Sequence, residues 1–500
     1  MKRTFWQKIY QDLRQNAFRV ILAVVSVVVA TAALSSISSS FTILRREMTR
    51  DFIDTNPFSA LLVVIPNDSL DLQQAVLRSP SVGKAEWGQT LEGRVEVSPN
   101  VWKKMHLFVV PDFNEKRINK IGIDQGQLPQ QAGEVLIERS CLSVITTSIG
   151  KSLAVTVENG KKASLKVSGI AHDPAQPPGW MHGEVYAYTR TESLPILGLP
   201  LVQNSLKLTL KDKTLSQSET RQVVLNLRKQ LEQQGFRVIR TLVPPPATHP
   251  HDRQLKAILS ILLVFSIITL VLASVVIANL MNGFLTRQIK QIGIMKAIGG
   301  TTPQLTRLYA GFIASMVLLG VSIGWTLHFP MARYFTNFVA NQLNFNILDP
   351  NASGWLYLLQ ISICSLIPFI FGLLPVRQTL RKSVLSALNY TGLQENYRSQ
   401  IMWRVRFISR PALLTLRNTF RQKRRFWLTM TSLALGGAAF MASLNLQKAW
   451  QHTIDQVAAK QRFDVDIKLF TPLSIPSFDS LAKSDTGIRN YEAWSSEKTL

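Results

Sequence analysis

Residues 284–304 read FLTRQIKQIGIMKAIGGTTPQ and stand between two long apolar runs. Their isoleucines and methionine recur at the spacing of one helix face, and basic residues lie between them. Gly299 and Gly300 follow, which is a signal for the end of a helix. The stretch therefore predicts a short basic amphipathic helix. Its function has to be inferred from the sequence on either side of it.

The composition indicates membrane spans combined with a folded polar part. The chain has 500 residues, of which 46% are hydrophobic, and a mean hydropathy of +0.11. The formal net charge of +25 would favour nucleic acid if the basic residues formed one soluble face, but they lie beside apolar runs instead. They are interpreted as orientation signals and lipid-headgroup contacts, and no nucleic acid partner is expected.

Five apolar runs are long enough to cross a hydrocarbon layer of roughly 30 Å as helices. They occupy residues 20–44, 256–283, 305–329, 355–376 and 426–446. The basic prefix of the first run also fits a cleaved signal peptide, but a retained anchor is preferred. Gly320 and Gly324 have GxxxG spacing, which predicts close helix packing in the third span. In the fourth span, a bend or an end is expected at Pro368, Gly372 and Pro375.

Residues 45–255 contain no spanning run and predict a large α/β domain between the first and second spans. Strand, helix and strand signals occur both at its start, over 58–97, and at its end, over 205–242. This indicates one split α/β unit with a mostly β insertion of about a hundred residues. Cys141 falls in this domain and Cys364 in the fourth span, so no disulfide between them is expected.

Charge placement predicts the orientation independently of hydropathy. The linker 377–425 carries twelve Lys or Arg residues against the single acid Glu395 and is expected in the cytoplasm. By alternation, the N-terminal segment 1–19 and the segment 284–304 lie on the same side, whereas residues 45–255 and 330–354 lie outside. The predicted location is the inner (plasma) membrane, with several spans and a cytoplasmic N-terminus.

The two ends of the chain share an order of features. LRQNAFRVIL at 13–22 resembles LRNTFRQKRRFWL at 416–428, and residues 51–65 resemble residues 461–470. A second copy of the unit is therefore expected to begin, with residues 447–500 as the start of a second outer domain. The chain is expected to be a fragment of a longer permease or an atypical truncation.

With residues 284–304 placed after the second span, the chain resembles an ABC transporter permease of the MacB/FtsX type, a type VII transmembrane subunit. The family motif, Arg-x-x-x-Glu-Ile-Gly-Ile-x-Lys/Arg-Ala-Ile/Leu-Gly, includes a coupling helix that docks on the ATPase. The matching positions here are Arg287, Gln291, Ile292, Gly293, Ile294, Lys296, Ala297, Ile298 and Gly299. Gln291 departs from the usual Glu but keeps hydrogen-bonding capacity.

The resemblance implies that a separate ABC ATPase dimer binds ATP and Mg, so that this chain holds no cofactor of its own. It also implies that the outer domain moves a lipid, lipoprotein, peptide or similar amphiphile, with membrane lipids and an extracytoplasmic accessory protein as further partners. The alternative is a signalling or regulatory transducer on the same scaffold. An ion-driven carrier is disfavoured because the spans hold almost no ionisable side chain except His328 at an edge.

Motifs for chemistry inside this chain are weak. The last three positions of the phosphate-binding motif GxxxxGKS are matched by Gly150, Lys151 and Ser152. The motif's first Gly is replaced by Ile145, so a turn followed by a strand is predicted here. The histidines near residues 172–182 and 249–251 lack a converging geometry, and no metal site is predicted. No side-chain constellation indicates catalysis, and the chain is not expected to be an enzyme.

For residues 284–304 a second interpretation stays open. Lys290 and Lys296 could hold an ordinary interfacial helix at the membrane surface. ATPase coupling is preferred because Gly293, Ala297 and Gly299 would let another protein's surface approach closely, and a lipid anchor has no need of small residues.

Overall fold

The computed structural model describes residues 2–64, 71–157, 160–201, 205–388 and 423–460, with isolated positions beyond. It divides into two compact units, residues 1–435 and 436–500. Most of the predicted basic linker and of the predicted second outer domain, including 461–470, lies outside the described residues.

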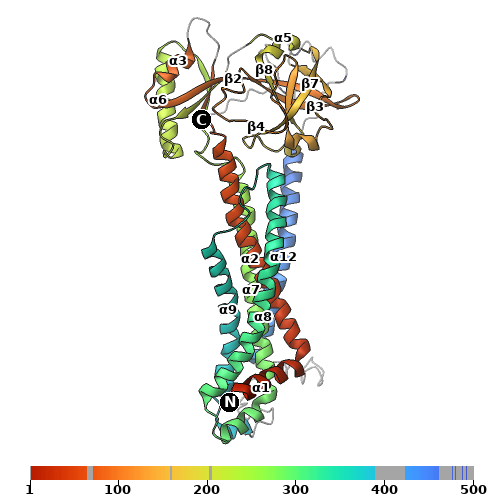
Figure 1. The fold of residues 1–500 in the computed structure, drawn as a ribbon, viewed down its shortest axis with the longest axis vertical. Helices are drawn as coiled ribbons and strands as arrows, with labels where there is room; N and C mark the ends of the chain where they lie inside the picture. The colour runs from red at the N-terminus through yellow and green to blue at the C-terminus, as the bar shows by residue number, and fades with distance from the viewer. Residues whose placement is uncertain are drawn as a thin grey trace. The chain divides into compact units, whose positions relative to one another are not determined.

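The first unit joins a helical bundle to an α/β domain (Figure 1). Its long helices are α2 (Ala17–Asp54), α7 (Asp252–Ala297), α8 (Thr302–Leu343) and α9 (Gly354–Leu380), with the shorter α1 (Lys2–Gln15) and α10 (Val384–Leu388). The helix α12 (Lys423–Lys460) holds a fifth apolar window. Five helices among the described residues are long and apolar enough to cross a membrane, as predicted from sequence.

The long helices extend well beyond the apolar runs that predicted them. Residues 330–343, expected in a loop, continue α8, and residues 284–297, expected as a separate short helix, continue α7. α9 also runs through Pro368 and Pro375 to Leu380, so the fourth span does not end there. Both prolines are buried in the bundle, and packing offsets the hydrogen bonds that they remove.

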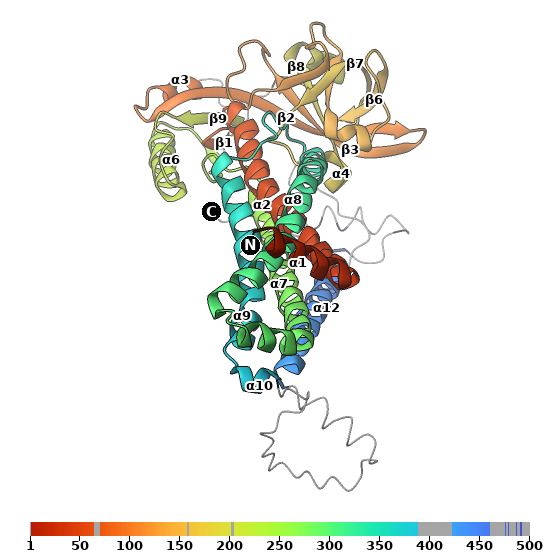
Figure 2. The same cartoon turned by 60° about the horizontal axis from the view of Figure 1, so that its bottom comes forward.

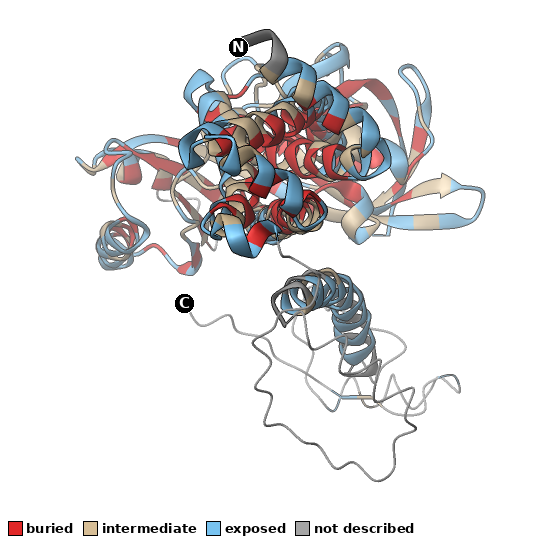
Figure 3. Cartoon of the chain, turned by 90° about the horizontal axis from the view of Figure 1, so that it is seen from below, coloured by how far each residue is buried: buried red, intermediate tan, exposed pale blue. Residues whose placement is uncertain are grey.

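The bundle core lies where α2, α7, α8 and α9 meet, and buried residues fill the centre of the bundle in Figure 3. Gly320 and Gly324 of α8 face α2, where an added Cβ would stand 2.8 Å from Val27 Cβ and 2.6 Å from the Val28 carbonyl oxygen. Glycine at both positions therefore permits a close approach of the two backbones.

The α/β domain has the split organisation that its sequence predicts. β1 (Ala60–Val64), α3 (Leu72–Leu77) and β2 (Val82–Ser98) open it, and β9 (Ser205–Leu210), α6 (Gln217–Gln233) and β10 (Val238–Leu242) close it. The insertion contains β3 (Val101–Val110), β4 (Gly122–Gly126), β5 (Glu134–Glu138), β6 (Ser152–Val157), β7 (Lys162–His172), α4 (Gly179–His182), β8 (Val185–Arg190) and α5 (Leu194–Leu197).

One sheet runs through both halves of the domain, in the order β10-β1-β9-β2-β3-β8-β5-β7-β4, with β6 paired to β2 and β7. β2 belongs to both halves because its first part pairs with β9 and its second part pairs with β3. Its length is visible in Figure 2. Ser152 begins β6 and Gly150 has a positive φ of 87°, so this motif is a turn and strand, as predicted. Cys141 and Cys364 are both free thiols.

Candidate functional site: a helical hairpin and a polar junction

The stretch 284–304 forms the connected ends of α7 and α8. α7 ends at Ala297, Gly299 turns the chain with a φ of 97°, and Thr301 starts α8 with a capping box to Gln304. The candidate coupling site is therefore the closed tip of a helical hairpin, not a free-standing helix. We call residues 287–301 the hairpin tip.

The residues with a predicted coupling role divide between the two faces of α7. Six of them are exposed: Arg287, Gln291, Ile294, Ala297, Ile298 and Gly299. Ile298 has 81% of its surface exposed and Ile294 has 53%. These two apolar side chains, four residues apart, present apolar surface at the hairpin tip, and this surface is the candidate contact with another protein.

The remaining three predicted residues serve the inside of this chain. Ile292 is buried in the bundle core. Gly293 faces α10, because an added Cβ would stand 3.1 Å from Ala387 Cβ and 3.3 Å from Leu388 Cγ. Glycine at 293 thus leaves space for α10 of the same chain. The sequence predicted instead that this glycine would contact the surface of another protein.

Lys296 is also occupied within the chain. Its Nζ donates to the carbonyl oxygens of Leu380 and, at 3.0 Å, Lys382, where α9 ends. A cation at this place satisfies carbonyl groups that a helix end leaves free. Lys296 therefore ties α9 to the hairpin, and Arg287 is the charged member of the predicted set that stays exposed.

A buried polar chain connects the hairpin to the N-terminal helix. Gln288 donates to Asp12 at 3.1 Å and accepts from the Tyr309 hydroxyl at 3.1 Å, and Lys8 donates to Asp12 at 2.8 Å. Asp12 is 3% exposed and Gln288 is 8% exposed. The α1, α7 and α8 helices are thereby linked side by side. Helical spacing places Gln288 on the apolar face, but no local pattern in the sequence indicates its partner in α1.

A second polar cluster joins the bundle to the α/β domain. Asn344 ends α8 in the left-handed conformation, with a φ of 59°. Its Nδ2 donates to Glu138 at 2.7 Å, and its Oδ1 accepts from Arg139 Nε at 2.7 Å. Two neighbouring residues at the end of β5 therefore hold both ends of one amide group. We call these three residues, with Asn346, the junction.

Other contacts reinforce the junction. Arg139 also donates to Asn346 at 2.8 Å, and Asp51 near the end of α2 pairs with His172 at 2.9 Å. The Trp180 indole donates to the Gln342 carbonyl at 3.0 Å. Both helices that leave the bundle here, α2 and α8, are thus bonded to the insertion half of the domain.

Burial dominates the electrostatics of the junction. It raises the pKa of Glu138 above the ordinary carboxyl value, although hydrogen bonds from Ser140 and Asn344 oppose the shift. Burial next to Glu138 also raises the pKa of the Cys141 thiol to about 12, so this cysteine is protonated and unreactive at neutral pH.

The two histidines before α7, His249 and His251, pack against each other and against α2. His249 is buried against Phe52 with ring centroids 5.5 Å apart, and its Nδ1 accepts from the His251 backbone N–H at 3.1 Å. Burial lowers the pKa of His249 to about 4, so it is neutral at physiological pH. Within the described part of the chain, no three His, Cys, Asp or Glu side chains are grouped as metal ligands.

Comparison with known proteins identifies part of the chain. Residues 263–384, from α7 to the start of α10, match the family described as FtsX-like permease C-terminal. No curated protein matches the sequence.

Two solved structures are similar to parts of the chain. The periplasmic region of MacB from Actinobacillus actinomycetemcomitans is 12% identical, with a TM-score of 0.25, over 42% of this chain and 97% of that one. A domain of a protein assigned as a permease, from Porphyromonas gingivalis, is 13% identical, with a TM-score of 0.23, over 36% of this chain and 86% of that one.

Proposed function

We propose that this chain is a membrane permease subunit of the MacB/FtsX type and that its hairpin tip receives the motion of a separate ABC ATPase. The match of residues 263–384 to the FtsX-like permease C-terminal family supports the proposal. ATP and Mg are bound by that ATPase dimer and not by this chain. In the proposed orientation the N-terminus and the hairpin tip are cytoplasmic, and the α/β domain lies outside the inner membrane.

The observation that carries the proposal is the continuity of α7. One helix of 46 residues runs from Asp252, just after the α/β domain, to Ala297 at the hairpin tip. At 1.5 Å per residue such a helix is on the order of 70 Å long, enough to cross a bilayer and project on both sides. A displacement of Ile298 at the hairpin tip would therefore move α7 as one continuous helix, up to its start beside the α/β domain.

The junction supports the same mechanism at the other end. Asn344 closes α8, the helix that follows the hairpin tip, and its amide is held by Glu138 and Arg139 of the α/β domain. A displacement of α8 would therefore pull on β5 through buried hydrogen bonds. Because such bonds are costly to break without replacement, the domain should follow the helix.

The output is proposed to be export or extraction of an amphiphilic substrate such as a lipid, lipoprotein or peptide. In the proposed orientation the α/β domain lies outside the membrane and is joined to several membrane helices. Movement of these helices could therefore displace a cargo bound by the domain without a pore. An extracytoplasmic accessory protein would receive the cargo. If instead the domain acts on a regulatory partner, ATP hydrolysis will respond to that partner and not to amphiphiles.

Ala297→Arg tests the coupling role. The exposed Ala297 would gain a long charged side chain in the contact with the ATPase, while the buried face of α7 stays unchanged. The full chain would be reconstituted in nanodiscs with a candidate ABC ATPase whose hydrolysis rate the unmodified chain stimulates. We expect the variant to lose the stimulation of ATP hydrolysis that the unmodified chain produces.

Ala132→Arg is the matched control, because it makes the same change at an exposed position of the α/β domain. It should keep full stimulation. Equal ATPase rates with Ala297→Arg and with the unmodified chain would contradict a coupling role for the hairpin tip.

A further inference from the structure

A basic pocket lies where α2 enters the α/β domain. Its volume is about 390 Å³, and four separate segments line it. They supply Asn56, Gly83, Lys84, Arg117, Lys120, Thr209, Leu210, Lys211 and Lys213. Five of these nine residues are cationic and none is acidic, so one sign of charge surrounds the space.

The nearby carboxylates have other partners. Glu86 accepts from the backbone N–H groups of Arg117 at 2.6 Å and Ile118 at 3.1 Å. Asp212, between two lining lysines, accepts from the backbone N–H and the hydroxyl of Thr214 at 2.9 and 2.7 Å. Neither side chain lines the pocket, so no acidic side chain in the described part of the chain is among the residues around its five cations.

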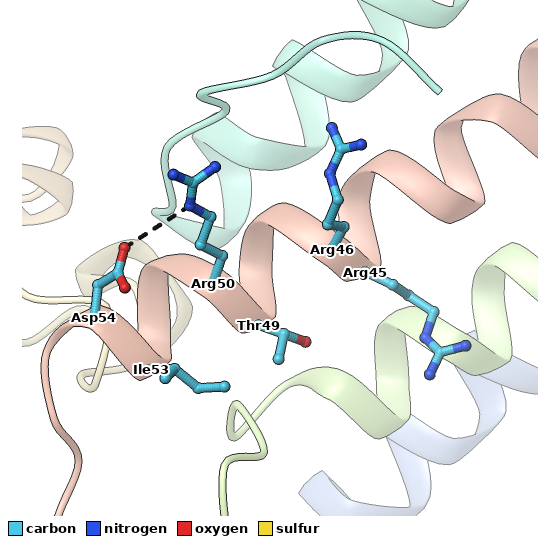
Figure 4. A pocket seen from close by; sticks show the side chains of 6 residues that line it. All are labelled: Arg45, Arg46, Thr49, Arg50, Ile53 and Asp54. Atoms are coloured by element: carbon cyan, nitrogen blue, oxygen red, sulfur yellow. Dashed lines mark ion pairs between the residues drawn. The ribbon is translucent and has the colours of Figure 1, made fainter. Parts of the chain in front are cut away.

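The pocket differs from the other basic groove of the chain. Arg45, Arg46 and Arg50 line a groove on α2 itself, together with Asp54. Figure 4 shows Arg45 and Arg46 pointing to opposite sides of the helix and Arg50 directed toward Asp54. Arg46 also pairs with Glu47 at 2.7 Å. Those guanidinium groups do not converge, and Arg46 and Arg50 already have acidic partners.

We propose that the basic pocket binds a phosphate-class oxyanion. A cleft lined by one sign of charge concentrates the field and attracts the opposite ion. Cationic donors that come from three segments can surround a tetrahedral anion, whereas a planar carboxylate is best held by a single fork. The volume holds a compact group such as a phosphate, a pyrophosphate or the headgroup of an anionic phospholipid.

The bound anion stabilises the connection between the end of α2 and the α/β domain, at residues 55–56. The Asn56 carbonyl accepts from Asn119 N–H at 3.1 Å, and the Thr55 carbonyl accepts from Lys120 N–H at 2.8 Å. The Asn56 amide donates to the Arg117 carbonyl at 2.6 Å and accepts from Lys213 at 2.9 Å. Three of the five cations, Arg117, Lys120 and Lys213, thus belong to residues that bond the end of α2, and an anion that neutralises them reduces the repulsion there.

Binding is tested with the full chain in nanodiscs of phosphatidylcholine, titrated with inorganic pyrophosphate by calorimetry. The pocket variant carries Lys84→Gln and Lys211→Gln, which remove two exposed cations and leave the Lys213 contact with Asn56 intact. The control variant carries Lys151→Gln and Lys229→Gln, two exposed lysines outside the pocket. Net charge is then equal in the two variants.

We expect the pocket variant to bind pyrophosphate at least about 10-fold more weakly, because it lacks two of the five cations that attract the anion. The control variant should bind like the unmodified chain, and added salt should weaken binding to the intact pocket. Pyrophosphate should also raise the Tm of the unmodified chain.

A second arm identifies the source of the anion. Nanodiscs containing phosphatidylglycerol should reduce pyrophosphate affinity of the unmodified chain, but not of the pocket variant, if a lipid headgroup occupies the pocket. An affinity that does not depend on the lipid would assign the pocket to a soluble phosphate compound. Equal binding by the pocket and control variants, or no binding by the unmodified chain in either arm, would overturn the proposal.

Discussion

Glu138 and Asn344 are 206 residues apart in the sequence, and their side chains meet through a buried hydrogen bond of 2.7 Å. Asn344 closes a membrane helix, and Glu138 ends a strand of the α/β domain. With Arg139 on the other side of the same amide, this contact bonds the end of α8 to the domain, next to the bond from Trp180 to the Gln342 carbonyl.

Asn344→Gly should weaken the junction without disturbing its backbone. Glycine accepts the left-handed conformation of residue 344, so the helix end survives, but Glu138 and Arg139 lose their shared partner. We expect the free energy of unfolding to fall by about 1–3 kcal/mol, because a buried carboxyl group is left with one donor fewer. Thermal unfolding in nanodiscs measures the effect. Asn100→Gly, also at a positive φ of 64° but in an exposed turn, should be nearly neutral.

Glu138→Gln should remove a pH dependence of stability. Because burial raises the folded-state pKa of Glu138, the group contributes stability below its unfolded pKa and loses it as the pH rises through the folded value. The Tm of the unmodified chain relative to Glu138→Gln should therefore decrease as the pH is raised from about 4 to 8. The exposed Glu115→Gln serves as control. A difference in Tm that stays constant with pH would refute the assignment to Glu138.

Gly324→Ala should separate α2 from α8. The new Cβ would stand 2.6 Å from the Val28 carbonyl oxygen, and a backbone atom cannot move aside without shifting the helix. Overpacking of this kind costs about 1–3 kcal/mol, which thermal unfolding would reveal. Gly283→Ala, in α7 with no atom within 4 Å, is the matched control and should be neutral or stabilising. Similar losses for the two variants would argue against close α2–α8 packing.

Gly293→Leu should displace α10 from the hairpin. Ala387 and Leu388 leave no room for a large side chain, whereas Gly293→Ala requires Ala387 and Leu388 of α10 to shift only slightly, because the added Cβ would stand 3.1 Å from Ala387 Cβ. We expect the leucine variant to lose about 1–3 kcal/mol and the alanine variant much less. Adding Leu388→Ala should restore part of the stability of the leucine variant. If Gly293 faced only a partner ATPase, both variants would be as stable as the unmodified chain.

Asp12 and Gln288 should be energetically coupled. A double-mutant cycle with Asp12→Ala and Gln288→Leu isolates their 3.1 Å hydrogen bond. We expect a coupling energy of about 1–3 kcal/mol, because the acceptor is a buried carboxyl group that would otherwise lose a donor. The pair Asp12→Ala and Thr286→Ala, with Thr286 exposed on the other face of α7, should be additive. Additive losses in both cycles would mean that α1 is not held by Gln288.

Local patterns in the sequence were sufficient for much of the fold. Hydropathy located the five apolar helices of the described residues, and the strand, helix and strand signals over 205–242 correspond to β9, α6 and β10. The split α/β unit followed from matching signals at the two ends of one domain. These features depend on residues a few positions apart, and their periodicity is written directly in the chain. Helix lengths were underestimated because α7 and α8 continue into polar sequence, where hydropathy gives no signal.

The sequence by itself determined the spans, the domain between the first two of them and the position of the hairpin at 284–304. Only the tertiary structure decided what each residue of that hairpin does: Gly293 and Lys296 are used inside the chain, and Ile298 is presented outside it. The same holds for the basic pocket and for the bond between Glu138 and Asn344. Each brings together segments that are distant in sequence, and such pairings depend on how whole elements pack, which no local period records.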